Sequence, residues 1–192
     1  MNKPTLLYLH GFMSSGSTLK GRALAQRYGE QFAVCLPTYP QLTPQHSIDF
    51  LLKLLQGAES GVLVGSSLGG FYAQYLGHVL NWPVVLINPA LDLACVSSDL
   101  SGCHTNPFTG EEVMVDEKWF DGLMQLQVAP VRPSLVLLCQ DDSTVRPDCA
   151  LQRYRGIGEV VLLPEGGHAC WPLTPVWPCL DAFITCHFAA EA

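Results

Sequence analysis

The sequence has 192 residues, enough to bury one substantial hydrophobic core and too few for two comfortable domains. Its 10 basic and 17 acidic residues give a formal net charge of −7 without any basic run, which disfavours nucleic acid as a partner. No stretch of about 18 consecutive apolar residues occurs, so no membrane span is predicted. We expect a single domain over residues 1–192.

Eight cysteines are scattered along the chain without a Cys-x-x-Cys pair. Cys35 and Cys139 end apolar runs, where free cysteine packs as a small hydrophobic residue. This spacing favours reduced thiols over disulfides, and reduced thiols favour a cytoplasmic location. The short apolar segment before His10 predicts a first strand and lacks the long apolar stretch of a secretory signal.

Short apolar runs alternate with segments of helical periodicity. The runs predict strands at residues 6–9, 32–36, 61–64, 84–87, 135–139 and 160–163. Helices are expected at residues 47–55, after residue 67 and at residues 177–188. Near-continuous apolar runs suit strands that are buried on both faces of a sheet. The predicted fold class is α/β, with a mostly parallel sheet of about six strands flanked by helices.

One long segment interrupts this alternation, between Asn88-Pro89-Ala90 and the strand that begins at Leu135. It exceeds a simple crossover and contains a predicted helix at residues 116–126, so we expect a small cap insertion at approximately 91–132. The alternative is an ordinary helix with a long irregular loop. Four apolar residues of the insertion are candidates for an acyl-binding pocket, although core packing explains them equally well: Phe108, Trp119, Phe120 and Leu123.

The segment Gly65-Ser66-Ser67-Leu68-Gly69 fits the Gly-x-Ser-x-Gly pattern and follows a predicted strand. This pattern is typical of a strand that ends in a sharp turn into a helix, which lifts the central hydroxyl clear of the sheet. Glycines flank the serine because larger side chains would collide with neighbouring backbone in so tight a bend. The pattern therefore predicts Ser67 as a nucleophile.

A serine hydroxyl needs a histidine to accept its proton and an acid to orient that histidine. His168 follows Gly166-Gly167 after the last predicted strand, and Asp142 follows the strand at 135–139. The chain order Ser, Asp, His is the one found with this type of serine turn. Asp141 remains an alternative acid, and Asp142 is favoured because Val145, three residues later, can pack against the core and fix the loop.

Backbone amides of Phe12 and Leu68 are the expected donors to an oxyanion, because Phe12 follows the first strand and Leu68 follows the nucleophile. His10 is expected to shape the turn before Phe12. The other histidines lack a glycine-rich turn and have no regular ligand spacing, so neither a metal nor a cofactor is predicted. They are His46, His78, His104 and His187.

Several of these segments together resemble the YqiA/YcfP-like esterases, small bacterial proteins of the α/β-hydrolase fold. The resemblance rests on Leu7-Tyr8-Leu9-His10-Gly11-Phe12, the serine motif, Asn88-Pro89-Ala90, Asn106-Pro107-Phe108-Thr109-Gly110 and Gly166-Gly167-His168-Ala169. It implies activity on short acyl esters or thioesters, with Ser67, Asp142 and His168 as the triad. Asp141 departs from the family pattern, which more often has glycine before the acid.

The sequence thus predicts a cytoplasmic serine esterase that hydrolyses short-chain carboxylic esters through an acyl-enzyme intermediate. A small-molecule ester or thioester is the expected partner, and the oligomeric state is not predicted. The alternatives are an acyl-CoA thioesterase and a hydrolase-fold protein that binds without turnover. Nucleotide binding is disfavoured because the glycine-rich turn lacks both P-loop and dinucleotide-site spacing.

Overall fold

The computed structural model describes residues 3–96 and 100–188. Parts of the predicted domain 1–192 and of the predicted insertion 91–132 therefore lie outside the described residues. The six predicted strands all form, as β1 (Thr5–Leu9), β2 (Ala33–Cys35), β3 (Gly61–Ser66), β4 (Val84–Ile87), β7 (Ser134–Cys139) and β8 (Glu159–Leu163).

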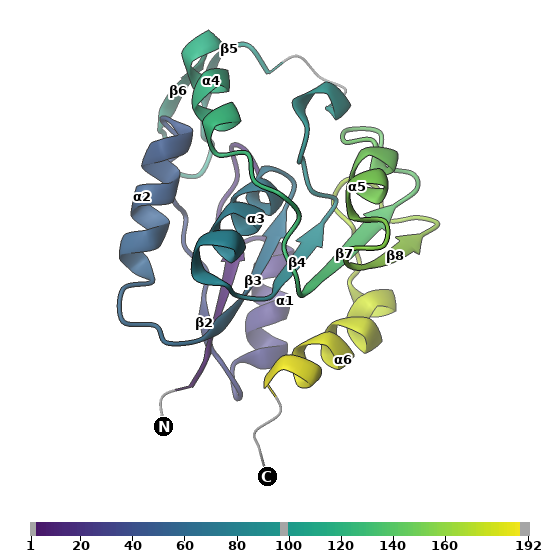
Figure 1. Ribbon diagram of the computed structural model, residues 1–192. Helices are drawn as coiled ribbons and strands as arrows, with labels where there is room; N and C mark the ends of the chain where they lie inside the picture. The colour runs from purple at the N-terminus through teal and green to yellow at the C-terminus, as the bar shows by residue number, and fades with distance from the viewer. Residues whose placement is uncertain (1–2, 97–99, 189–192) are drawn as a thin grey trace.

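These strands form one parallel sheet in the order β2-β1-β3-β4-β7-β8, so the predicted α/β class is confirmed (Figure 1). The chain runs outward from β1 to β2 and then returns to the other side of β1 with β3. Ligands of open α/β sheets bind beyond the carboxyl ends of the strands, at the point where the strand order reverses. In this sheet that point lies between β1 and β3.

Helices cover both faces of the sheet. Helix α1 (Leu19–Tyr28) and helix α6 (Trp177–Phe188) pack on one face through residues that include Leu24 and Leu180. The other face is covered by α3 (Leu68–Leu80) and α5 (Pro147–Tyr154), with α2 (Pro44–Leu54) and α4 (Glu117–Gln125) in the same core cluster. Apolar side chains at helical spacing, such as Ile48 and Leu51 of α2, form each buried stripe.

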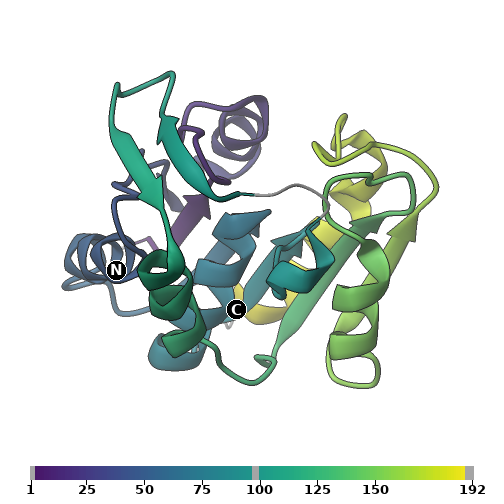
Figure 2. The same ribbon diagram turned by 90° about the horizontal axis from the view of Figure 1, so that it is seen from above.

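The segment between β4 and β7 contains more structure than the predicted helix. A 3-10 helix (Leu93–Cys95) comes first, and strands β5 (Gly102–Thr105) and β6 (Glu112–Val115) then form an antiparallel hairpin before α4 (Figure 2). The side-chain amide of Asn106 in the hairpin connection donates to the Ser14 carbonyl at 3.0 Å. This bond ties the insertion to the loop that follows β1.

The prediction that the cysteines are reduced thiols is wrong for two of them. Cys95 and Cys149 form a disulfide that joins the 3-10 helix to α5, across 54 residues of sequence. Sequence spacing carried no sign of this pair because the two residues meet only through the fold. The other six cysteines are free. The cytoplasmic location rested on the reduced-thiol interpretation, so it remains a prediction.

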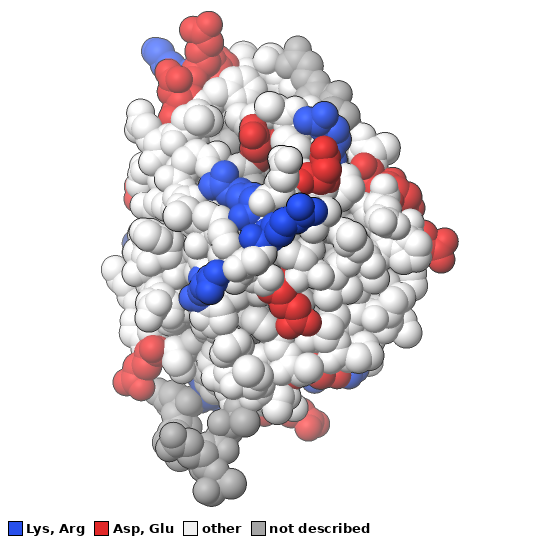
Figure 3. All heavy atoms as spheres, turned by 45° about the vertical axis from the view of Figure 1, so that its right-hand side comes forward, with Lys and Arg blue, Asp and Glu red and all other residues white. Residues whose placement is uncertain are grey.

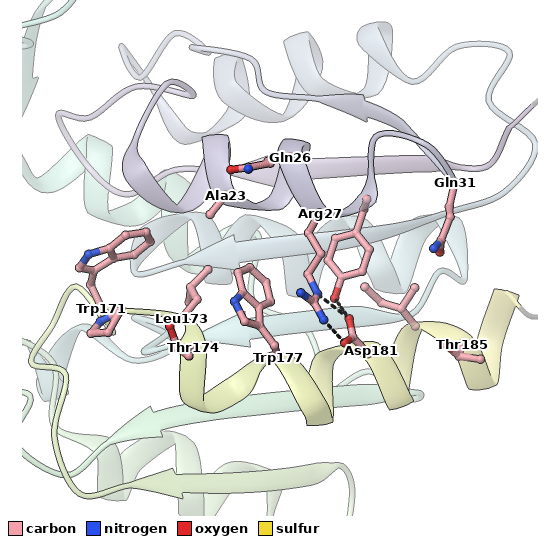
Figure 4. A pocket seen from close by; sticks show the side chains of 13 residues that line it. Ala23, Gln26, Arg27, Gln31, Trp171, Leu173, Thr174, Trp177, Asp181 and Thr185 are labelled. Atoms are coloured by element: carbon pink, nitrogen blue, oxygen red, sulfur yellow. Dashed lines mark hydrogen bonds and ion pairs between the residues drawn. The ribbon is translucent and has the colours of Figure 1, made fainter.

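A hollow of about 660 Å³ lies between α1 and α6 (Figure 4). Arg27 of α1 forms an ion pair with Asp181 of α6, and its guanidinium stacks 4.8 Å from the centre of the Trp177 ring. The hydrogen bonds from Arg27 lower the pKa of the Asp181 carboxyl. These contacts hold the two helices together, and the hollow contains none of the sequence-predicted site residues.

The surface carries a modest density of charged side chains. On the face shown in Figure 3, a small group of Lys and Arg side chains lies beside Asp and Glu side chains. Within residues 3–96 and 100–188, every helix is too short or too polar to cross a bilayer.

Candidate active site

Ser67 occupies the sharp turn between β3 and α3. Its backbone adopts φ 56° and ψ −125°, a region that L-residues rarely occupy, and its amide donates to the Ile87 carbonyl at 3.0 Å. A Cβ added to Gly65 would lie 2.2 Å from the Gly69 oxygen, and one added to Gly69 would lie 2.1 Å from the Leu9 oxygen. Glycine is therefore required on both sides of the turn, as expected from the motif.

His168 lies between Ser67 and Asp142. Its Nε2 is 3.0 Å from Ser67 Oγ, and its Nδ1 is 2.8 Å from Asp142 Oδ2. The Asp142 side chain is fully buried, whereas the imidazole is 30% exposed. With Nδ1 donating to the carboxylate, Nε2 is free to accept the serine proton. The structure thus brings His168 together with Asp142, which is 26 positions away in the sequence, and with Ser67, which is 101 positions away.

The two neighbouring aspartates contact different groups. Asp142 Oδ1 accepts from the amides of Thr144 and Val145 at 2.8 and 3.0 Å, which leaves its other oxygen for His168. Asp141 instead accepts from the amides of Gly166 and Gly167 at 3.2 and 2.8 Å. Asp142 therefore orients the imidazole, and Asp141 fixes the glycine turn that precedes it.

Asn88 is a residue of the site whose side-chain role the sequence did not reveal. It is buried at the end of β4 with φ 42°, a conformation that asparagine tolerates better than most residues. Its Oδ1 accepts from the Cys139 amide at 2.8 Å, and its Nδ2 donates to the carbonyls of Gly167 and His168 at 2.9 and 3.2 Å. One side chain thus connects the ends of β4 and β7 to the histidine loop.

The predicted oxyanion donors lie beside the serine. Phe12 and Leu68 both line the cavity that contains Ser67, and Leu68 is the first residue of α3. Amides in the first turn of a helix have no partner within the helix, so the Leu68 N–H suits a developing negative charge. A Cβ on Gly11 would lie 3.2 Å from Ser67 Cβ, which shows how closely the chain after β1 approaches Ser67.

His10 contacts the turn that follows β1 and contains Gly11 and Phe12. The residue is fully buried, its Nδ1 donates to the Gly11 carbonyl at 2.8 Å, and its ring stacks on Tyr39 with centroids 4.2 Å apart. Burial lowers the pKa of His10 to about 4, so the ring is neutral near neutral pH. Its contacts agree with the expected role in shaping the turn.

The cavity at Ser67 has a volume of about 540 Å³ and a largely apolar wall. The wall comes from the loop after β1, the serine turn, the end of β4 and the insertion: Phe12, Leu68, Ala90, Leu93, Val96 and Leu100. Polar residues of β1, of α1 and of the loop between them also line the cavity: Tyr8, Ser14, Thr18 and Lys20. Periodicity could not single out these residues, because they converge only in the folded chain.

None of the four residues expected to bind an acyl group lines this cavity. Trp119 and Leu123 are buried core residues, and Phe120 packs against that core. Phe108 is 63% exposed on the hairpin connection. Core packing, the alternative explanation, accounts for Trp119, Phe120 and Leu123. Of the insertion residues that the structure describes, those that line the cavity are Leu93, Val96 and Leu100. Among the described residues, no three His, Cys, Asp or Glu side chains gather as a metal site.

Solved structures with a similar fold include three hydrolases or esterases. A putative hydrolase from Agrobacterium vitis S4 is 17% identical with a TM-score of 0.75, covering 95% of this chain and 88% of its own. Est1E from Butyrivibrio proteoclasticus is 14% identical with a TM-score of 0.76, covering 98% and 89%. The metagenome-derived LipS and LipT structure is 18% identical with a TM-score of 0.74, covering 97% and 95%. These likenesses establish the α/β-hydrolase fold.

Curated relatives are bacterial proteins named for one family. A Shewanella woodyi protein is 37% identical over 98 residues, which cover 45% of this chain and 51% of that protein. A Yersinia pseudotuberculosis protein is 30% identical over 126 residues, which cover 62% and 67%. The chain thus spans about half the length of the Shewanella relative. The profile of the uncharacterised protein family UPF0227 matches residues 5–184. The resemblance to YqiA-type proteins is therefore confirmed, and this chain belongs to the uncharacterised protein family UPF0227.

Proposed function

We propose that this protein is a serine hydrolase that cleaves short-chain carboxylic esters. The observation that carries the proposal is the hydrogen-bonded series Ser67 Oγ, His168 Nε2, His168 Nδ1 and Asp142 Oδ2, with distances of 3.0 and 2.8 Å. This geometry combines a nucleophile, a base within proton-transfer reach and an acid that orients the base. Structural neighbours described as esterases, lipolytic enzymes and a pyrethroid hydrolase support the same reaction class.

In the proposed first step, Ser67 Oγ attacks the acyl carbon while its proton moves to His168 Nε2. The buried carboxylate of Asp142 stabilises the imidazolium that forms. Amides of Phe12 and Leu68 donate to the carbonyl oxygen as it becomes negative. The carbon–oxygen bond to the leaving group then breaks, and the His168 proton passes to the departing alkoxide. The products are a free alcohol and an acyl-Ser67 ester.

In the second step a water molecule attacks the acyl carbon, and His168 accepts its proton. The bond to Ser67 Oγ breaks, the proton returns to the serine, and a carboxylic acid leaves. No redox or metal chemistry enters this sequence, so no cofactor is required. We propose that the apolar wall, with Leu93, Val96 and Leu100, holds the acyl group and that the insertion acts as a cap on a single domain.

Thioester hydrolysis is a close alternative, because the same triad would attack a thioester carbonyl. Comparing 4-nitrophenyl esters with acyl-CoA substrates separates the two. The other alternative is binding without turnover, since a fold does not determine a function. The formed triad argues against that alternative. A protein that only binds has no need for an imidazole held between a hydroxyl and a buried carboxylate.

The direct test is hydrolysis of 4-nitrophenyl butyrate by wild type and by Ser67→Ala. We expect Ser67→Ala to lose about three decades or more of kcat with the fold intact, as removal of a triad nucleophile does. Ser60→Ala is a matched control, because Ser60 is exposed and precedes the opposite end of the same strand. Near-normal turnover by Ser67→Ala would refute the proposal.

A further inference from the structure

Lys20 is the one Lys or Arg side chain among the described residues that line the active-site cavity. Of the other described residues that line the cavity, all are apolar, uncharged polar or His168, and none is Asp or Glu. Lys20 is half-buried in the first turn of α1. Its ammonium donates to the Ala169 carbonyl at 2.5 Å and has no salt-bridge partner among the described residues. Two of its three N–H donors are therefore left for another group.

The placement of Lys20 carries an electrostatic cost. Desolvation lowers the pKa of Lys20, because burial penalises its charged form, and the nearby Asp142 carboxylate offsets this only in part. A cation in the first turn of a helix is also opposed by the helix dipole, whose positive end lies there. Helix α1 has no acidic residue in its first turn to offset this charge. The Lys20 ammonium and the positive end of the α1 dipole thus lie together at a largely apolar cavity.

Several polar groups line the same cavity as Lys20. Thr18 is the N-cap of α1, and its hydroxyl contacts the Tyr8 hydroxyl at 3.1 Å. Burial raises the pKa of Tyr8 to about 12, so this hydroxyl keeps its proton at neutral pH. Ser67 and His168 line the same cavity. A molecule whose carbonyl is at Ser67 can therefore extend toward Lys20 without leaving the cavity.

We propose that Lys20 binds a carboxylate or other anionic group of the substrate, so that the preferred substrates are esters that carry a negative charge. This inference rests on the proposed esterase function and adds the substrate class. A carboxylate at Lys20 would replace the lost hydration of the ammonium with charge-assisted hydrogen bonds. An uncharged ester would leave the ammonium without that compensation.

The test compares two pairs of esters that differ mainly in charge. For the leaving-group side, 3-acetoxybenzoate is compared with 3-acetoxybenzamide. For the acyl side, the mono-4-nitrophenyl ester of adipic acid is compared with the same ester of adipamic acid. In at least one pair, we expect wild type to prefer the anion in kcat/KM by about tenfold or more, the range of a charge-assisted hydrogen bond.

Lys20→Gln removes the charge and retains a donor for the Ala169 carbonyl. We expect it to abolish the preference for the anion, and Lys20→Arg to restore it. Lys3→Gln is the matched control, because Lys3 is exposed and donates to the Gly29 carbonyl at 3.2 Å, outside the cavity. Inhibition by 3-hydroxybenzoate, compared with 3-hydroxybenzamide, gives a second readout that does not need turnover. It should weaken in Lys20→Gln if the leaving group carries the charge.

The assignment of Lys20 would be overturned if the preference for the anionic ester, measured as the ratio of the two kcat/KM values, were the same in Lys20→Gln as in wild type for both pairs. If the neutral esters are still hydrolysed and Ser67→Ala abolishes that activity, the proposed esterase function stands and only the substrate class fails. If Ser67→Ala hydrolyses every ester as well as wild type does, the proposed function fails and the inference fails with it.

Discussion

The Asn88 side chain donates to the Gly167 carbonyl at 2.9 Å and thereby attaches the histidine loop to the end of β4. The same side chain accepts from the Cys139 amide, at the end of the strand that leads to Asp142, the proposed triad acid. Asn88 contacts no reacting atom. In the proposed reaction, its effect is to hold the loop that carries His168 in place relative to the loop that carries Asp142.

Replacement of Asn88 by glycine removes these bonds while still permitting its positive φ. We expect kcat to fall about tenfold to a hundredfold with a smaller change in KM, because a displaced imidazole loses its alignment with Ser67. Asn81→Gly is the matched control, since Asn81 also has a positive φ, 55°, but caps the far end of α3. Steady-state kinetics on a 4-nitrophenyl ester measures both variants, and equal kcat values would show that Asn88 does not position the base.

The two aspartates should be separable by substitution with asparagine. Asp142→Asn should lower kcat by about three to four decades, because an amide can stabilise neither the imidazolium nor the required tautomer. Asp141→Asn should cost far less, since an amide oxygen still accepts from one of the two glycine amides that Asp141 now binds. A larger loss in Asp141→Asn than in Asp142→Asn would reverse the assignment of the acid.

Stability should depend on the protonation of His10. Burial lowers the pKa of His10 from 6.5 to about 4, so between these values the unfolded chain binds a proton that the folded protein does not. The free energy of unfolding therefore decreases as the pH falls through this window, by at most about 3 kcal/mol from this residue.

Urea unfolding at several pH values measures this effect. His10→Phe should show a shallower loss of stability between about pH 6.5 and pH 4 than wild type, because it lacks the titrating group. His78→Phe, at an exposed position on α3, should keep the wild-type slope. Parallel curves for wild type and His10→Phe would mean that His10 is protonated alike in both states.

The disulfide should contribute to stability. Because Cys95 and Cys149 are separated by 54 residues, their link restricts the unfolded chain, and reduction should lower the free energy of unfolding by about 2–4 kcal/mol. Thiol titration of the unfolded protein should find six free thiols before reduction and eight after it. Cys149→Ser should mimic reduction, whereas Cys103→Ser, which alters an exposed free thiol, should not. Eight thiols without reductant would show that the bond is absent.

The strands and the serine turn were predictable because their signals are local. Continuous apolar runs mark β3 and β4, and the glycines beside Ser67 are required by contacts within a few ångströms. The last helix forms at the predicted residues, Trp177–Phe188. The order of Ser67, Asp142 and His168 follows from strands that end at one edge of the sheet, so their proximity was also expected.

Contacts between distant segments were not predictable. The β5–β6 hairpin was missed because its strands are short and only β6 alternates clearly between buried and exposed residues. The Cys95–Cys149 bond and the cavity wall depend on how the insertion folds over the sheet. Asn88 offered one signal, an asparagine before proline at a strand end, but its partners lie 51 to 80 residues away.

The central claim is that Ser67 is a nucleophile activated by His168. Labelling of the folded protein with a fluorophosphonate, followed by mass spectrometry of the peptides, tests this claim most directly. We predict one label per chain, on Ser67, with no labelling of Ser67→Ala and much slower labelling when His168 is replaced by alanine. Failure of folded wild type to react, or equal labelling of Ser67→Ala, would contradict the claim.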